Sequence, residues 1–234
     1  MAPGSKSKRL RRCDKDSDDE SGGDELLNKH NIRVLDNRVF FNADVSHDAV
    51  FALNLRLRQL ERDTLAQGAA VAQLLCPGGE DPSALAAALP ARPIILHVTS
   101  YGGSVDAAFS AVDCIQGLRV PVHTVVDGYV ASAATLITLA GVKRSIAPNA
   151  YMLLHELRSS LWGKMSAIDD EHSNLTKYME HLKKFYVEHT KLTHKRLEKL
   201  LKKDVNWNAA ECLEHGLVDS IEGARARDAA DSDD

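Results

Sequence analysis

Hydrophobic and polar residues change their spacing several times along the chain, and each change predicts a new element. Apolar residues dominate two short runs, Ile32 to Phe41 and Pro93 to Thr99, which is typical of buried strands. Between these runs, apolar residues recur every three or four positions from Asp48 to Leu65, as they do on one face of a helix. Ser46 lies just before that segment and is its predicted N-cap.

The alternation between strand and helix continues through the centre of the sequence. The predicted elements are a helix from Val105 to about Gln116 with Ser104 as its N-cap, a strand from Val122 to Val126, a helix from Ala131 to Ala140 and a strand from Ala150 to Leu154. Strands that are joined through helices form right-handed crossovers and pair in parallel. The pattern therefore predicts an α/β fold with a largely parallel sheet and crossover helices.

One further helix is too long to be only a crossover. From Ser166 to Glu188 an apolar stripe follows helical spacing and includes Leu175, Leu182 and Phe185. A projecting helix of about six turns needs a second apolar surface, and another subunit is the simplest source of one. The sequence therefore predicts self-association through this helix.

Three segments depart from the alternation. Residues 1–28 contain a basic cluster followed by an acidic run, and residues 223–234 are rich in Ala and Asp. Such segments cannot bury enough surface to offset the entropy of ordering, so both are predicted to be disordered tails around a domain at 29–222. Residues 67–92 combine a Cys-Pro-Gly-Gly sequence with an Ala-rich stretch, which predicts an insertion with a helix end, a surface loop and one short helical turn.

Composition and charge exclude several classes of protein. With 234 residues and 44% hydrophobic content, the chain is long enough for one α/β core. A formal net charge of −4 provides no basic excess for binding nucleic acid, and the longest apolar runs are shorter than the roughly 18 residues of a membrane span. The four cysteines have no CxxC spacing and no apolar signal region opens the chain, so we expect no disulfide, no structural zinc and a reducing, cytoplasmic compartment.

Three short motifs carry candidate chemistry, each where a predicted strand gives way to a turn or helix. They contain Ser132, His155 and the adjacent glycines Gly102 and Gly103. A serine hydroxyl becomes a good nucleophile when an imidazole accepts its proton and fixed amide donors meet the developing oxyanion. Ser132 lies at a predicted helix start, where the amide of Ala133 has no partner within the helix. These residues therefore offer the parts of an acyl-transferring hydrolase.

A simpler interpretation exists for each motif. Ser132 can be an ordinary serine in the first turn of a helix, the glycine pair can be only a turn, and His155 can be a structural histidine. Spacing alone does not choose a carboxylate partner for the histidine. The candidates are Asp127, Asp169, Asp204 and Asp219. The GxSxG signature of an α/β-hydrolase is absent from the Ser132 motif.

Four motifs, in order along the chain, resemble those of the proteolytic subunit of the Clp protease. Ser-Tyr-Gly-Gly-Ser at 100–104 is similar to that family's Ser-Pro-Gly-Gly-Ser loop, and Gly-Tyr-Val-Ala-Ser-Ala-Ala at 128–134 is similar to its nucleophile motif. Tyr-Met-Leu-Leu-His at 151–155 resembles the strand that delivers the family's base, and Asp204 to Ile221 resembles its C-terminal block. The resemblance extends from about Arg38 to Ile221.

Two details narrow the resemblance and one departs from it. Tyr101 in place of the loop proline and a shortened link between Ser132 and His155 look closest to Clp-like peptidases of phages and large viruses. The charged N-terminal tail replaces the residues that usually form the family's axial loops, which puts docking of an unfoldase in question.

The resemblance implies a role for each candidate residue. Ser132 is implied as the nucleophile, His155 as the general base and then general acid, and Asp204 as the carboxylate that fixes the imidazole tautomer. The implied oxyanion hole consists of Gly102, Gly103 and Ala133. No metal and no cofactor are implied for this chain, because ATP is used by a partner.

The resemblance also implies an assembly. The expected Clp/crotonase-like fold has a projecting handle, here residues 160–190, that joins two heptameric rings into a tetradecamer. Inside this chamber, in the cytoplasm, unfolded polypeptides fed by an AAA+ unfoldase would be cut by a serine endopeptidase. Two alternatives follow from the same likeness: a weakly active or structural ring subunit, and an acyl-CoA enzyme of the related crotonase fold.

Overall fold

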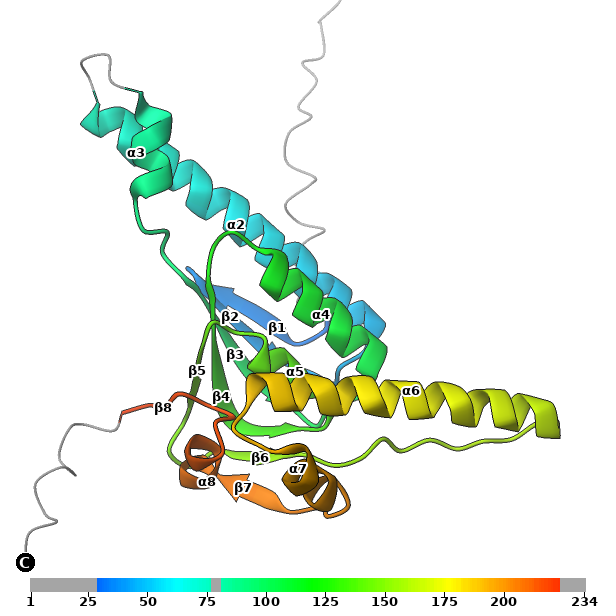
Figure 1. Ribbon diagram of the computed structural model, residues 1–234. Helices are drawn as coiled ribbons and strands as arrows, with labels where there is room; N and C mark the ends of the chain where they lie inside the picture. The colour runs from blue at the N-terminus through cyan, green and yellow to red at the C-terminus, as the bar shows by residue number, and fades with distance from the viewer. Residues whose placement is uncertain (1–28, 77–80, 224–234) are drawn as a thin grey trace, which may run out of the picture.

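Within residues 29–76 and 81–223, which the computed structural model describes, the centre is an eight-stranded sheet (Figure 1). Its strands are β1 (Ile32–Leu35), β2 (Arg38–Asn42), β3 (Ile94–Ser100), β4 (Val122–Ala131), β5 (Lys143–Ile146), β6 (Tyr151–Leu153), β7 (Asn206–Asn208) and β8 (Ser220–Ile221). The order is β1-β2-β3-β4-β5-β8, and β6 pairs with both β4 and β7. Neighbouring strands are parallel except in the pairs β1–β2 and β6–β7. The predicted largely parallel sheet is confirmed.

The single strand predicted from Ile32 to Phe41 is wrong, because the segment is a hairpin. β1 and β2 pair antiparallel with Leu35 opposite Arg38, so the chain reverses at Asp36 and Asn37. Asp36 has a left-handed φ of 56°, a conformation that Asp and Asn tolerate better than most residues because their side chains can bond the local backbone. The turn was missed because it is only two residues long.

β4 is longer than the predicted strand Val122 to Val126, and it changes partner halfway. Its first half pairs with β5, and its second half pairs with β6. Between the two halves Gly128 adopts a left-handed φ of 70°, which a glycine allows at little cost. The strand thus continues past the predicted end and places Ala131 opposite Leu153.

Helices α2 (His47–Leu75) and α4 (Val105–Gly117) lie side by side against the sheet, and α5 (Ala133–Leu139) follows β4 (Figure 1). Both predicted N-caps are confirmed. The Ser46 hydroxyl accepts from the N–H of Ala49 at 3.2 Å, and the Ser104 hydroxyl accepts from the N–H of Ala107 at 3.1 Å. These caps set where each helix leaves the preceding loop.

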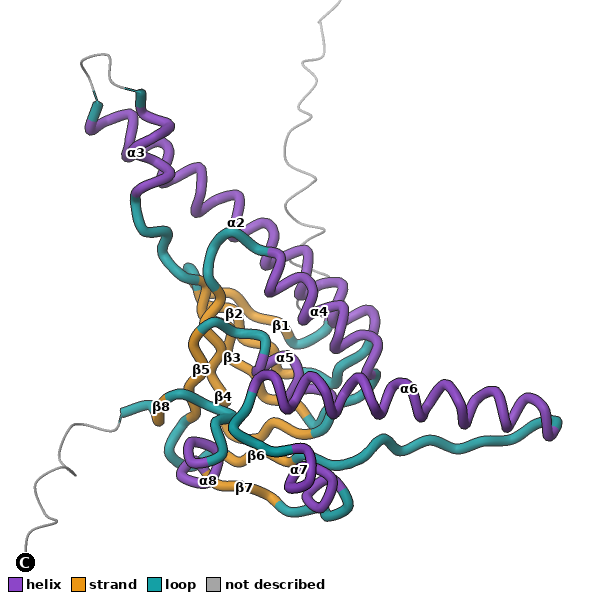
Figure 2. The backbone as a smooth tube through the Cα atoms, viewed as in Figure 1, coloured by secondary structure: helices purple, strands orange, loops and turns teal. Residues whose placement is uncertain are grey.

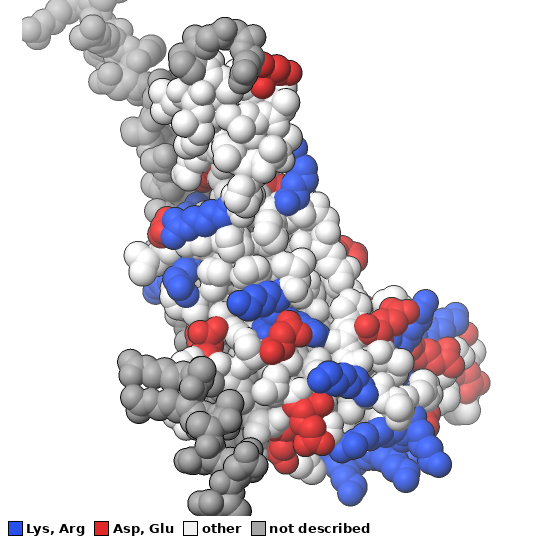
Figure 3. Space-filling model, turned by 60° about the vertical axis from the view of Figure 1, so that its left-hand side comes forward, with Lys and Arg blue, Asp and Glu red and all other residues white. Residues whose placement is uncertain are grey.

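α2 continues past its predicted end at Leu65 to Leu75, because the added turns are rich in helix-forming Ala and Leu and contain no proline. α3 (Pro82–Ala88) then packs back against it, so the predicted helix end and short helical turn are both present, and both are longer than expected. The far part of this hairpin, residues 64–75 and 82–91, contains no Lys, Arg, Asp or Glu. Figure 3 shows it as a protrusion with few charged side chains.

α6 (Met165–His189) confirms the predicted long helix; it is about 37 Å long, and its N-terminal part projects from the body (Figure 2). Its apolar stripe has two environments. Leu182, Phe185 and Tyr186 are buried at the base, whereas the free end near Met165 is exposed. The chain after β6 runs as an extended loop beside α6 toward that free end (Figure 2). The short helices α7 (His194–Leu201) and α8 (Ala209–Glu214) follow.

The predicted tails at residues 1–28 and 224–234 lie outside the described residues. Where the structure does describe the chain, Cys76, Cys114 and Cys212 are unpaired. In the same ranges, no group of three or more His, Cys, Asp or Glu side chains is placed to hold a metal ion. None of the helices described there combines the length and the apolar character that crossing a membrane requires.

Candidate active site

Ser132 connects the end of β4 to the start of α5 in an unusual backbone conformation. Its φ of 55° and ψ of −130° lie outside the regions that residues with a side chain normally occupy, at a cost of about 1–3 kcal/mol. The surrounding hydrogen bonds stabilise this turn, because the N–H of Ser132 donates to the carbonyl of Leu153 on β6 at 2.9 Å. A strained strand-to-helix turn of this kind exposes the side chain of a nucleophile.

The carbonyl of Ser132 is held from the other side. Thr135 donates to it twice, from its hydroxyl at 2.6 Å and from its N–H at 3.0 Å. Since the Thr135 hydroxyl has a single proton, the Tyr186 hydroxyl must be the donor in the 2.5 Å bond between them. Burial raises the pKa of Tyr186 to about 12, so the phenol keeps its proton. The base of α6 is thereby tied to the Ser132 turn.

Gly102 and Gly103 form a loop between β3 and α4 that is closely packed on both sides. A Cβ at Gly102 would lie 2.6 Å from the Cβ of Ser132, and one at Gly103 would lie 2.3 Å from the carbonyl oxygen of Val45. Val45 accepts from the N–H of Ser104 and donates to the carbonyl of Gly102, each at 2.8 Å. Gly103 lies between Gly102 and Ser104, the two residues that bond Val45. In such a parallel bridge the N–H of the middle residue points away from the partner strand, here from Val45.

Gly103, Ser132, Ala133 and His155 line one cavity of about 420 Å³, with the base of α6 on another side. Within residues 29–76 and 81–223, no hydrogen bond engages the N–H of Gly103 or Ala133. The N–H of Gly102 is different, because it donates to the hydroxyl of Ser100 at 3.1 Å. Two amides beside Ser132 are therefore available as donors.

His155 is half-buried and lies just after β6. Its Nδ1 is 2.6 Å from the carbonyl oxygen of Glu156. A carbonyl can only accept, so Nδ1 carries the proton and Nε2 is left as an acceptor. In the described part of the chain, no hydrogen bond joins His155 to Ser132 or to Asp204.

Asp204 lies three residues beyond the end of α7, and its partner is Arg158 and not His155. Its carboxylate forms a hydrogen-bonded ion pair with the guanidinium of Arg158, and it is not among the residues that line the cavity. The structure thus places the predicted nucleophile, base and two amides together and packs Gly102 against Ser132. The predicted carboxylate of the triad, Asp204, is instead paired with Arg158.

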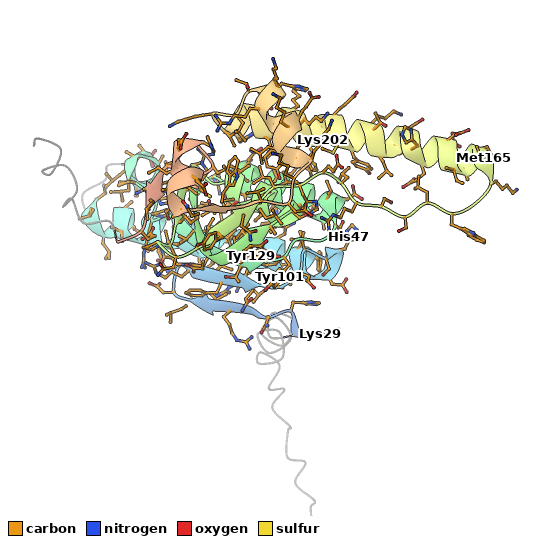
Figure 4. The ribbon with its side chains drawn as sticks, turned by 90° about the horizontal axis from the view of Figure 1, so that it is seen from below. Lys29, His47, Tyr101, Tyr129, Met165 and Lys202 are labelled. Carbon is orange, nitrogen blue, oxygen red and sulfur yellow. The ribbon has the colours of Figure 1, made fainter. Side chains whose placement is uncertain are left out.

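Two residues next to the site were not predicted from the sequence. The ring centres of Tyr101 and Tyr129 are 5.3 Å apart (Figure 4), and the Tyr129 hydroxyl donates to Oδ1 of Asn206 at 3.0 Å. Burial, followed by the proximity of Tyr101 and Asp204, raises the pKa of Tyr129. A signal was present, because the glycine-loop motif and the nucleophile motif each carry a tyrosine in their second position.

Comparison with known proteins identifies relatives of this chain. The family model described as Clp protease matches residues 64–225. An ATP-dependent Clp protease proteolytic subunit 2 of Treponema denticola is 35% identical over 132 residues, which cover 56% of this chain and 66% of that protein. An ATP-dependent Clp protease proteolytic subunit 1 of Tropheryma whipplei is 34% identical over 155 residues, which cover 64% and 71%. The matched parts are thus about two thirds of these relatives' own lengths.

A solved structure supports the fold. A ClpP1 mutant from Listeria monocytogenes superimposes with a TM-score of 0.62 and 21% sequence identity, covering 79% of this chain and 90% of that one. The likeness confirms the predicted Clp/crotonase-like architecture. These named relatives are bacterial, so a special closeness to phage and viral forms stays a prediction. The family match covers more than half of the sequence, including Ser132, His155 and Asp204, and the chain therefore belongs to the Clp protease family.

Proposed function

We propose that this chain is the proteolytic subunit of a Clp-type protease, a serine endopeptidase that cuts unfolded polypeptides. One observation carries the proposal: Ser132 shares a cavity with His155 and with the unengaged amides of Gly103 and Ala133. The names of the bacterial relatives support the same activity. The peptidase domain in this proposal spans residues 29–222.

In the proposed reaction, the hydroxyl of Ser132 attacks the carbonyl carbon of the substrate while Nε2 of His155 accepts its proton. The negative charge that develops on the carbonyl oxygen is stabilised by the N–H groups of Gly103 and Ala133. His155 then donates the proton to the departing amine, and a water molecule hydrolyses the acyl-enzyme by the same steps. Gly102 serves this site mainly by its small size, since its own N–H already has a partner.

Asp204 completes the mechanism when its carboxylate is turned toward Nδ1 of His155. There it accepts a hydrogen bond from Nδ1–H, holds the imidazole in one tautomer and stabilises the imidazolium that forms in the transition state. None of these steps calls for a metal ion or a bound cofactor in this chain.

The proposal includes an assembly. The exposed free end of α6 supports association of two rings through the handle at residues 160–190, and heptameric rings stacked as a tetradecamer are the arrangement we propose. An AAA+ unfoldase would feed this chamber, in keeping with the "ATP-dependent" names of the relatives. The unpaired cysteines of the described part are compatible with a cytoplasmic location.

One alternative has a specific observation in its favour. A weakly active or mainly structural ring subunit would fit the pairing of Asp204 with Arg158, since a triad lacking its carboxylate contact is a poor catalyst. The proposed acyl-CoA alternative gains nothing comparable, because it would not require the strained Ser132 turn. Activity measurements separate these possibilities.

The decisive experiment compares the wild-type chain with Ser132→Ala in hydrolysis of a fluorogenic peptide and an unfolded protein. We expect activity to fall by about 10³-fold or more, because removing one member disables the whole catalytic unit. Ser173→Ala is the matched control, since that serine is exposed on α6 and bonds only the carbonyl of Asp169. A fluorophosphonate should label Ser132 in the wild type and in the control. Equal rates for wild type and Ser132→Ala would refute the peptidase assignment.

A further inference from the structure

Arg158 holds the carboxylate that the proposed mechanism needs. Its guanidinium forms a hydrogen-bonded ion pair with Asp204, while Arg158 itself lines the cavity that contains Ser132 and His155. The two side chains are 68% and 55% exposed, so neither is locked in place by packing. The ion pair is therefore a contact that can be exchanged for another.

His155 has a substitute partner at the position a triad carboxylate would occupy. Its Nδ1 donates to the carbonyl of Glu156 at 2.6 Å, so the ring is in the tautomer that catalysis requires but, within the described residues, forms no hydrogen bond to a carboxylate. A carbonyl orients the ring yet stabilises the imidazolium less than a carboxylate does. His155 thus carries its proton on the required nitrogen, Nδ1, but within the described residues has no carboxylate partner to stabilise the imidazolium.

The local backbone explains why these groups are neighbours. The N–H of Glu156 donates to the carbonyl of Leu201 at 2.9 Å, which joins the chain after β6 to the end of α7. Arg158 follows this junction by two residues on one segment, and Asp204 follows it by three on the other. Asp204 can therefore meet Arg158 or His155 by a change of side-chain and local loop conformation, without movement of the sheet.

We propose that Arg158 is a positioning residue that competes with His155 for the carboxylate of Asp204. With Asp204 on Arg158 the site is weakly active, and with Asp204 on His155 the triad is complete. This inference rests on the proposed function and deepens it, because it names a residue that sets what fraction of the molecules has Asp204 bonded to His155.

The exposure of the pair limits the size of the effect. Exposed ion pairs shift an equilibrium by up to about fivefold, and salt weakens them. Arg158→Gln should therefore raise kcat about two- to fivefold at low salt with KM nearly unchanged. Arg158→Lys keeps the charge but loses the planar fork of the guanidinium, so its kcat should lie between those of wild type and Arg158→Gln.

The salt dependence of kcat tests the competition directly, and its first measurement uses the wild type alone. Raising the salt from ~0.05 M to ~0.5 M should increase kcat of the wild type by a similar factor, because screening releases Asp204. The kcat of Arg158→Gln should stay flat over the same range. Arg92→Gln is the matched control, since Arg92 and Asp36 form another exposed ion pair, 2.6 Å long, and neither residue lines the cavity; it should follow the wild type.

A double-variant comparison completes the test. In an Asp204→Asn background, Arg158→Gln should no longer accelerate labelling of Ser132 by a fluorophosphonate, because no carboxylate is left to compete for. A wild type that loses activity with salt, or an Arg158→Gln variant with unchanged or lower kcat, would overturn the proposal while Ser132→Ala remained inactive. If Ser132→Ala kept wild-type activity, the proposed function itself would fail instead.

Discussion

At the scale of single residues, the site depends on two glycines, Gly102 and Gly103, as much as on Ser132 and His155. Ser132 can adopt its strained turn because Gly102 leaves room for it, and Gly103 approaches Val45 more closely than any residue with a Cβ could. The two glycines therefore allow the close packing that stabilises the turn of Ser132, the proposed nucleophile.

Gly102→Ala should damage both stability and activity. The new methyl would meet Ser132 and the carbonyl of Ala131, and alanine is unfavourable at the φ of 96° found there. We expect a loss of about 2 kcal/mol or more in the free energy of unfolding, measured by urea denaturation, with a large fall in kcat. Gly68→Ala is the control: it lies in α2 with open space around it and should stabilise the protein by about 0.5–1 kcal/mol. Unchanged activity in Gly102→Ala would contradict the packing described.

Sequence patterns predicted part of this site and not the rest, for a physical reason. Ser132 and His155 each follow a strand of a largely parallel sheet, and the carboxyl ends of parallel strands lie at one edge, so their proximity could be expected. Asp204 could not be placed in the same way, because it lies in an exposed turn where a long, flexible side chain such as Arg158 can reach it. Contacts between exposed, flexible side chains do not depend on hydrophobic periodicity, so the sequence pattern does not predict them.

At the scale of elements, one ion pair joins three of them. Arg144 on β5 bonds Asp219, just before β8, at 2.6 Å through its guanidinium and at 2.8 Å through its backbone N–H. The same guanidinium donates to the carbonyl of His189 at the end of α6 at 2.5 Å. The last residues of the handle helix are thereby attached to the edge of the sheet.

Asp219→Asn should weaken this junction in a pH-dependent way. Burial works to raise the pKa of Asp219, but its bonds to Arg144 and the charges of Arg144 and Lys143 outweigh it and lower the pKa. The ionised carboxylate therefore stabilises the fold above its unfolded pKa of about 3.9, and this stabilisation is lost as the pH falls through the lower folded value.

The measurement is urea unfolding of wild type and Asp219→Asn between pH 7 and pH 3. Since the Asp219 side chain is 42% exposed, screening limits the expected difference to about 1 kcal/mol at pH 5–7. The difference should shrink below about pH 4. Asp36→Asn, in the more exposed pair with Arg92, should show a smaller difference. A gap between wild type and Asp219→Asn that widens toward pH 3 would be incompatible with this assignment.

The larger elements followed from periodicity, and the errors occurred where elements are short. The long helix α6 and the strand β3 were predicted nearly to their ends. β5, β7 and β8 have two to four residues each and were not predicted, because so few positions cannot display a period. Their pairing is decided by the neighbouring strands and not by their own sequence.

At the scale of the whole molecule, the apolar stripe of α6 divides between the protomer's own core and its surface. Leu182 is 4% exposed, so a charge placed there would disrupt the protomer itself and would not report on assembly. Trp162, next to the free end of α6, is 98% exposed. That end is where a contact between subunits can be tested without unfolding either one.

Trp162→Glu should weaken association and leave the protomer folded. An exposed indole that becomes buried in an interface contributes strongly to binding, and a carboxylate there would be desolvated. We expect sedimentation velocity to show smaller species than for the wild type, with an unchanged circular dichroism spectrum. Trp162→Phe retains an aromatic surface and should keep the wild-type size. A Trp162→Glu particle of wild-type size would exclude this part of α6 from the interface.

The pairing of β4 with β6 has a consequence for how such proteins can vary. Ser132 and His155 follow strands held in register, Ala131 opposite Leu153, at the ordinary strand spacing of about 4.8 Å. Their separation is thus set by the ladder and is independent of how many residues the chain uses to travel from one to the other. Homologues can therefore gain or lose residues in the loop at 147–149, between β5 and β6, and protein engineers can graft new sequence there, while Ser132 and His155 keep their separation.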